Sequence, residues 1–227
     1  MQKRDTRRIG VLVFADDFGT QHPEVFAKAE DGPKLLAALH DDRAALAGLF
    51  DELDATFRTV AEATVERGAA RNDVYRTARI VNRFASSVGQ TGTEAKFELR
   101  PGKDRELEAL AHTFVASATE MATRLQLRGM TADTPSKLST QVEALSTAMA
   151  KQKTARETGI GIRAAIEARF KSARTTLLAM DPIVRHGAVQ DPKLIAAWRA
   201  GVRIGPASRP KHEATTATPE AQKPKTA

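Results

Sequence analysis

The chain has 227 residues, which is enough for one sizeable core and too few for a large multidomain enzyme. Only 5% of the residues are aromatic and none is cysteine, which argues against β architectures and excludes disulfide scaffolds, thiolate metal sites and cysteine nucleophiles. The net charge of +7 gathers at the two ends, because residues 1–10 and 203–227 each carry +3.

The N-terminal apolar segment predicts a short helix over about residues 3–18. Leu12, Ala15 and Phe18 share one helical face, and a lone β-strand among helices would have no partner for its hydrogen bonds. Acidic residues follow the apolar run at once, which does not fit a signal peptide, and no stretch approaches the ~18–20 apolar residues that span a bilayer. We therefore expect a cytoplasmic protein.

Three further segments repeat apolar side chains at the spacing of a helical stripe. The first covers about residues 33–67 and closes at Gly68, the second covers about residues 70–88, and the third covers about residues 103–128. Two long connections then remain, at residues 19–32 and 89–102.

The fourth stripe begins near Pro135, with Thr134 as its N-cap, and keeps its apolar register to Met180. Gly159 and Gly161 interrupt it, and each glycine costs about 1 kcal/mol relative to alanine inside a helix. A loop would usually reset the phase of the stripe, so we favour one long helix that is weakened or kinked at the two glycines. Two helices that meet there remain the alternative.

Two Asp-Pro pairs near the end of the chain each combine an N-cap residue with proline at the first helical position. Asp181 with Pro182 and Asp191 with Pro192 therefore both predict helix starts. The second pair should begin a short helix over about residues 192–202.

These patterns predict an all-α fold: an elongated, coiled-coil-like antiparallel bundle of four main helices with short terminal helices. Residues 1–202 should form the helical domain. Residues 203–227 are rich in Pro, Thr, Ala and Lys and lack large apolar side chains, so they should form a disordered basic tail. The stripes hold many alanines and threonines, which bury less area than leucine, so a homodimer is plausible.

Three groups of residues form a pattern along the chain: Phe18, His22 and Phe26; Lys96, Phe97 and Leu99 ahead of Pro101 and Gly102; and residues 180–185, 191–194 and 196–198. This arrangement resembles a family of uncharacterised bacterial helical proteins of about this length. The resemblance covers nearly the whole chain except the tail and implies an all-helical fold. That family has no assigned activity, ligand or functional residue, so the resemblance implies no function.

Arginines crowd the second predicted helix, where Arg76, Arg79 and Arg83 form a single ridge, and residues 67–93 carry a net charge of +4. Such an arginine ridge would suit a nucleic acid or another anionic surface. The favoured interpretation is structural, because residues 41–66 carry −5. A short connection would make the two segments antiparallel neighbours, and their charges would then compensate across one interface.

The fourth predicted helix places Gln152, Arg156 and Arg163 on its apolar stripe, where charged groups are costly unless they are paired or hydrated. A helix that extends past its neighbours is the favoured explanation. A partner surface and a site for an anionic ligand remain open.

No pattern in the sequence indicates catalysis, a metal or a cofactor. There is no Glu-x-x-His motif, no nucleophile elbow, no P-loop and no dinucleotide fingerprint. We therefore expect a non-enzymatic interaction or structural module whose partner is another protein or a second copy. Binding of nucleic acid or an anionic surface through the basic termini and the arginine ridge is the main alternative, and a small ligand near Arg156, Gly159 and Arg163 is the second.

Overall fold

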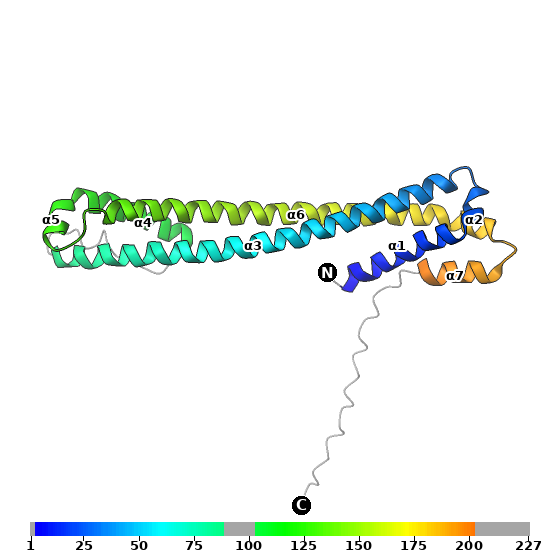
Figure 1. The fold of residues 1–227 in the computed structure, drawn as a ribbon, viewed down its shortest axis with the longest axis horizontal. Helices are drawn as coiled ribbons and strands as arrows, with labels where there is room; N and C mark the ends of the chain where they lie inside the picture. Colours follow the sequence, from blue (N-terminus) through cyan, green and yellow to red (C-terminus); the bar gives the residue numbers. More distant parts are fainter. Residues whose placement is uncertain (1–2, 89–102, 203–227) are drawn as a thin grey trace, which may run out of the picture. The chain divides into compact units, whose positions relative to one another are not determined.

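A computed structural model describes residues 3–88 and 103–202, and every element within them is an α-helix. The predicted all-α fold is confirmed. The predicted connection 89–102 and the predicted tail 203–227 lie outside the described residues. In chain order the helices are α1 (Lys3–Gln21), α2 (Pro23–Ala27), α3 (Gly32–Val88), α4 (Asp104–Glu120), α5 (Ala122–Leu127), α6 (Thr134–Gly187) and α7 (Pro192–Val202), as Figure 1 shows.

The contacts of the chain gather in two compact units. Unit 1 comprises the described residues of Met1–Ala44 and Phe170–Ala227, and unit 2 comprises those of Ala45–Arg169. Helices α3 and α6 each contribute to both units. The expectation that residues 1–202 form one domain stays a prediction.

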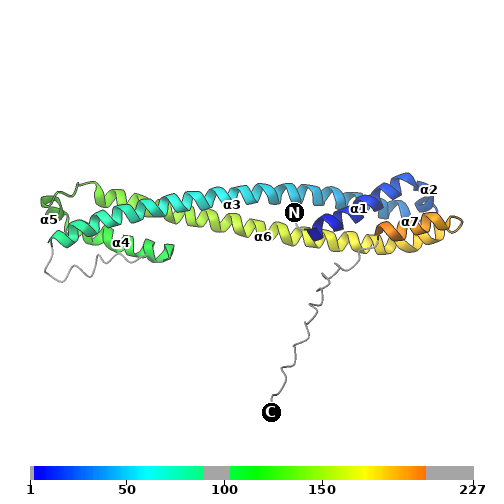
Figure 2. The ribbon, with the colours of Figure 1, turned by 90° about the horizontal axis from the view of Figure 1, so that it is seen from below.

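Unit 1 is built around aromatic side chains from three helices. The ring of Phe18 on α1 lies 5.0 Å from that of Trp198 on α7 and 6.4 Å from that of Phe26 on α2, measured between centroids. Trp198 is fully buried, and its indole Nε1 donates a hydrogen bond of 3.2 Å to Asp181 on α6. Helices α1 and α7 lie side by side in Figure 2 and contact each other directly.

The predicted N-terminal helix is confirmed and extends to Gln21. The predicted connection that follows it contains the short helix α2, which begins at Pro23. The residue before a proline is disfavoured in the α conformation, so His22 separates the two helices. A Cβ atom on Gly32 would collide with the backbone oxygen of Phe26, which explains the glycine at the start of α3.

Unit 2 packs α4 and α5 against the stretches of α3 and α6 that belong to it. Its core consists of aliphatic and small residues with one phenylalanine: Val74, Ala78, Val81, Ala85, Leu107, Ala111, Phe114, Ala118, Leu125, Met130, Leu138, Val142 and Leu145. Figures 1 and 2 show α3 and α6 side by side and running in opposite directions within this unit.

The predicted helix boundary at Gly68 is wrong, because α3 runs without interruption from Gly32 to Val88. A glycine costs only about 1 kcal/mol inside a helix. Buried residues on both sides of it, Ala63 and Val74, keep α3 packed in unit 2. Residues 41–66 and 67–93 therefore do not form antiparallel neighbours, and the predicted compensation of their charges is wrong as well.

The third predicted helix is divided at Met121, whose backbone angles of φ −99° and ψ 10° end α4 and begin α5. The fourth predicted helix is one helix, α6, and Gly159 and Gly161 do not break it. Pro182 lies inside α6, so the predicted helix start at Asp181 is wrong. The start at Asp191 is confirmed, because its Oδ1 accepts hydrogen bonds from the backbone N–H groups of residues 193 and 194 at 3.0 and 3.1 Å.

Candidate interaction surfaces

The polar residue at the contact between α3 and α6 in unit 2 is satisfied inside the chain. Gln152 is only 3% exposed, and its Nε2 donates to Thr64 Oγ1 at 2.6 Å. Its Oε1 accepts a hydrogen bond of 2.7 Å from Arg67 Nη1. We call Gln152, Thr64 and Arg67 the polar seam. Because both ends of the Gln152 amide are bonded, the polar seam needs no ligand to complete its hydrogen bonds.

Charged side chains at the borders of this seam are paired with neighbouring helices. Arg67 Nε lies 3.1 Å and Arg71 Nε 2.9 Å from the carboxylate of Asp104, which is the first residue of α4. Lys151 on α6 lies 2.8 Å from Glu66 on α3. The basic residues near position 67 thus pair with α4 and not with the acidic part of α3, a pairing that no local sequence pattern indicates.

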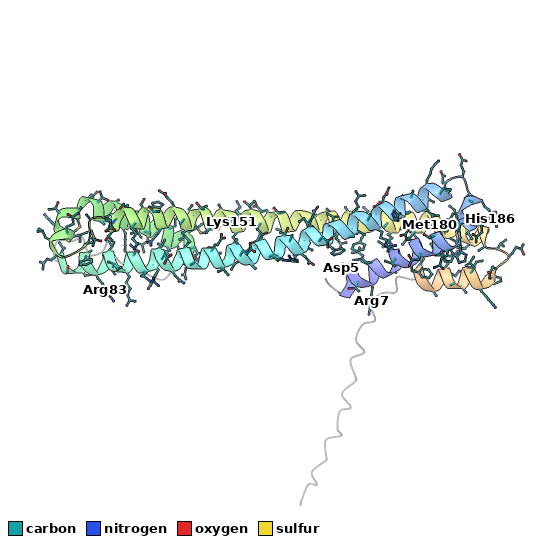
Figure 3. The ribbon with its side chains drawn as sticks, viewed as in Figure 1. Asp5, Arg7, Arg83, Lys151, Met180 and His186 are labelled. Atoms are coloured by element: carbon teal, nitrogen blue, oxygen red, sulfur yellow. The ribbon has the colours of Figure 1, made fainter. Side chains whose placement is uncertain are left out.

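The arginine ridge lies in the open on α3. Arg76, Arg79 and Arg83 are all exposed, and none of them forms an ion pair with another residue in 3–88 or 103–202. Figure 3 shows Arg83 pointing outward from the helix. The ridge is therefore available to a partner, as the alternative interpretation of the sequence requires.

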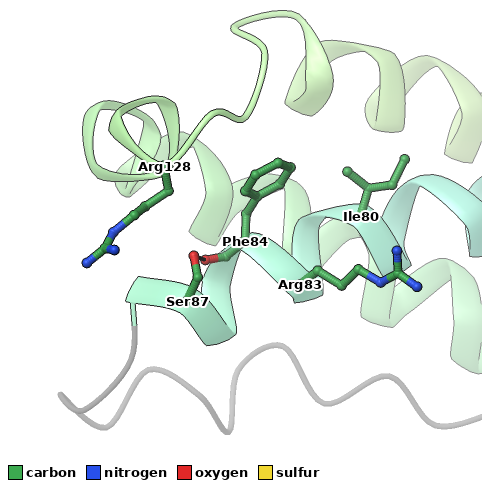
Figure 4. A pocket seen from close by; sticks show the side chains of 5 residues that line it. All are labelled: Ile80, Arg83, Phe84, Ser87 and Arg128. Carbon is green, nitrogen blue, oxygen red and sulfur yellow. Dashed lines mark hydrogen bonds between the residues drawn. The ribbon is translucent and has the colours of Figure 1, made fainter.

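A hollow of about 460 Å³ lies at the end of the ridge, lined by Ile80, Arg83, Phe84, Ser87 and Arg128. Figure 4 shows the guanidinium groups of Arg83 and Arg128 extending away from each other. The hydroxyl of Ser87 donates to the backbone oxygen of Phe84 at 2.6 Å. These groups do not converge on one point, so the hollow is part of an open surface and not a cradle for a single small anion.

The two arginines predicted on the stripe of α6 lie at its exposed edge. The guanidinium carbon of Arg163 lies 5.2 Å from the ring centroid of Phe57 on α3, a cation–π contact. Arg156 is exposed and forms no ion pair among the described residues. Since α3 packs beside this stretch of α6, the favoured explanation of a helix that extends past its neighbours is wrong.

Because α3 is continuous from Gly32 to Val88, one exposed surface runs along its solvent side. Residues at spacings of three and four follow its solvent side, all of them exposed, and we call them the outer stripe: Asp51, Asp54, Arg58, Ala61, Val65, Ala69, Asn72, Arg76, Arg79 and Arg83. Such spacing places side chains on one face of a helix. The stripe begins with acidic residues, has small apolar residues at its centre and ends with the arginine ridge.

The charges of the outer stripe have no ion-pair partner among residues 3–88 and 103–202. Asp51, Asp54 and Arg58 form no ion pair within the part that the structure describes, and the same holds for the arginine ridge. Val65, at the centre of the stripe, is 73% exposed. The polar seam and the outer stripe thus differ sharply, because only the seam is satisfied internally.

A charged cluster in unit 1 has a structural explanation. Asp16 on α1 is 8% exposed and accepts a hydrogen bond of 2.5 Å from Arg43 on α3, and His40 lies 3.4 Å from the same carboxylate oxygen. These contacts tie α1 to α3. Within residues 3–88 and 103–202, no three His, Asp or Glu side chains gather where they could hold a metal ion.

No described helix combines the length and the apolar character needed to cross a membrane. A comparison of the chain with protein families, with curated proteins and with solved structures finds no match.

Proposed function

We propose that this chain is a non-enzymatic helical interaction module that binds another protein through the outer stripe of α3. The observation that carries the proposal is the contrast between the two sides of α3 in unit 2. Side chains at the seam, such as Arg67 and Glu66, have partners on α4 and α6. Those of the outer stripe have none among the described residues.

The composition of the outer stripe also suits a protein partner better than a uniform polymer of one charge. Its acidic residues Asp51 and Asp54 would repel an anion, and its exposed centre around Val65 offers apolar area for burial. Opposite charges at the two ends of one face fix the register of a protein partner. A cytoplasmic location stays a prediction from the sequence.

Site-specific photocrosslinking would test the proposal. A photoreactive amino acid at Val65 should give discrete protein adducts, whereas one at Leu127 should not, although that side chain is 82% exposed on α5 of the same unit. The Val65 adducts should disappear when Asp51 and Asp54 are both replaced by asparagine. Absence of protein adducts at Val65, or equal adducts at both positions, would refute the proposal.

Binding of nucleic acid or an anionic surface is the second candidate, and the exposed arginine ridge favours it. Substitutions at the acidic end of the outer stripe distinguish this candidate from a protein interaction. Replacing Asp51 and Asp54 by asparagine should strengthen binding of a labelled DNA duplex if the ridge binds phosphates, because it removes repulsion. The same change should weaken a protein complex that depends on both ends of the stripe. Replacing Arg76, Arg79 and Arg83 by glutamine should lower the salt dependence of DNA binding.

A small ligand near Arg156, Gly159 and Arg163 gains no support from the geometry. Both arginines are exposed, and the buried polar residue nearby, Gln152, is bonded to Thr64 and Arg67.

A further inference from the structure

We infer that the partner of the outer stripe is a second copy of this chain, bound antiparallel along α3 with Val65 at a twofold axis. This inference rests on the proposed function and names its partner. The reason is that the charges of the stripe complement one another when the helix is reversed about its centre.

Residues equally far from the axis face each other in an antiparallel pair related by twofold symmetry. Asp51 lies fourteen residues before Val65, and Arg79 lies fourteen residues after it. Asp54 and Arg76 lie eleven residues before and after the same position. Each acidic residue of one copy would therefore meet an arginine of the other, and the symmetry repeats both pairs.

The centre of the stripe contains nothing that opposes this approach. About Val65, Ala61 faces Ala69, and both are small and exposed. Arg58 faces Asn72, which is neutral and can accept a hydrogen bond through its amide oxygen. No two like charges of the stripe are placed opposite each other in this register.

Other arrangements of two copies are less favourable. A parallel pair would place Asp51 against Asp51 and Arg79 against Arg79. Moving the antiparallel axis to the point midway between Val65 and Asn72 would pair Asp54 with Arg83, but it would place Arg58 opposite Arg79 and leave Asp51 without an arginine of the stripe opposite it. Like charges that face each other at an interface disfavour the wrong register, so the sequence of the stripe selects the one centred on Val65.

The structure also shows that the surface is long and regular enough for such a pair. All the residues from Asp51 to Arg79 belong to one uninterrupted helix in unit 2, which rises by ~42 Å between them. Spacings of three and four along a face are those of coiled-coil seams. Exposed ion pairs are individually weak and are screened by salt, so the dimer should dissociate on dilution and at high salt.

Cysteine crosslinking tests the position of the axis, and the chain provides a clean background because it has no cysteine. In Val65→Cys, the two thiols meet at the axis and should form an intermolecular disulfide under mild oxidation. Leu127→Cys is the matched control, since that position is 82% exposed and lies outside the stripe. The disulfide of Val65→Cys should form at least about tenfold faster, because pairing raises the effective concentration of its thiols.

Charge reversal tests the register. Asp51→Arg with Asp54→Arg places arginines against arginines, and Arg76→Asp with Arg79→Asp places aspartates against aspartates, so each double variant should be monomeric by light scattering. The variant that carries all four changes should dimerise again, which misfolding of a double variant could not explain. Circular dichroism would check that each variant keeps its helices.

Crosslinking of Val65→Cys no faster than that of the control, or failure of the fourfold variant to dimerise, would overturn the inference. If photocrosslinking at Val65 captures a different protein and never a second copy, this inference fails while the proposed function stands. If Val65 captures no protein at all, both fail.

Discussion

The two units of the chain hold their helices together with different side chains. Unit 1 packs the rings of Phe18, Phe26 and Trp198 against one another in tilted and edge-to-face arrangements. Unit 2 relies on alanines, valines and leucines, with Ala78 and Ala111 both fully buried. Aromatic side chains bury large areas and prefer particular ring geometries, whereas alanines allow close approach but bury little. Large side chains therefore fix unit 1 locally, while unit 2 gains its stability along the length of its helices.

Three glycines, Gly32 and Gly187 in unit 1 and Gly68 in unit 2, also differ in how closely their surroundings pack. In unit 1, a Cβ atom on Gly32 or Gly187 would collide with the backbone of Phe26 or Val25, so these positions require glycine. In unit 2, a Cβ atom on Gly68 would meet no neighbouring atom. Close contacts with neighbouring backbone therefore require glycine at positions 32 and 187, whereas nothing around Gly68 does, and the glycine at position 68 did not mark a helix boundary.

The comparison predicts that a change to the aromatic cluster has the largest effect on stability. Trp198 is fully buried and donates a hydrogen bond to Asp181, so Trp198→Ala would leave a cavity and remove that hydrogen bond, while the Asp181 carboxylate would keep its ion pair with Arg185. We expect the free energy of unfolding to fall by about 3–5 kcal/mol, as in other large-to-small core substitutions. Urea denaturation followed by circular dichroism measures this change.

Two controls sharpen this test. Leu178→Ala removes a side chain that is 66% exposed in unit 1 and should change the free energy of unfolding by less than about 0.5 kcal/mol. Hydrogen exchange on Trp198→Ala should show faster exchange in α1 and α7 than in α4. Equal acceleration in α4 would contradict the idea that the aromatic cluster acts within unit 1.

A change to the polar seam of unit 2 should have an intermediate effect on the free energy of unfolding. Gln152→Ala would remove a buried amide and its hydrogen bonds to Thr64 and Arg67, and we expect a loss of about 1–3 kcal/mol in the free energy of unfolding. Lys153→Ala is the control, because that residue is exposed and pairs at 3.8 Å with Glu157, one turn away on the surface of the same helix. Similar losses for the two variants would show that the amide contributes little.

Much of the fold followed from the sequence because local signals and packing agreed. Capping by Asp191 ahead of proline predicted α7, and the continuous apolar phase predicted that α6 would pass through Gly159. The signals failed where packing outweighed them. Gly68 lies within α3. Pro182 lies inside α6, where the carbonyl that loses its hydrogen bond belongs to Leu178 on the exposed side of the helix, within reach of water.

The interaction surfaces were predicted only in part, because the helix boundary predicted at Gly68 divided α3 into two helices. Sequence patterns singled out Arg76, Arg79 and Arg83, and the structure places all three in the open on one helix. The acidic residues Asp51 and Asp54 were assigned to a different helix, so the outer stripe that joins both groups could not be seen. The partner of Arg67, Asp104, is close only in the folded chain.

The smallest effect should appear at the start of α6 in unit 2, where Asp133 precedes the helix. A hydrogen bond from Thr131, and then one from its own backbone, hold the pKa of this exposed carboxyl below its ordinary value of 3.8. A carboxyl whose pKa is lower in the folded chain stabilises the fold above pH 3.8, and this contribution is lost as the pH falls through the folded pKa. Asp133→Asn should therefore be slightly less stable than the parent chain at neutral pH, and the difference should shrink as urea denaturation is repeated at lower pH. Glu143→Gln, an exposed change on α6, is the control. If the difference in stability between Asp133→Asn and the parent chain stays the same in acid, Asp133 acts through hydrogen bonding and not through its charge.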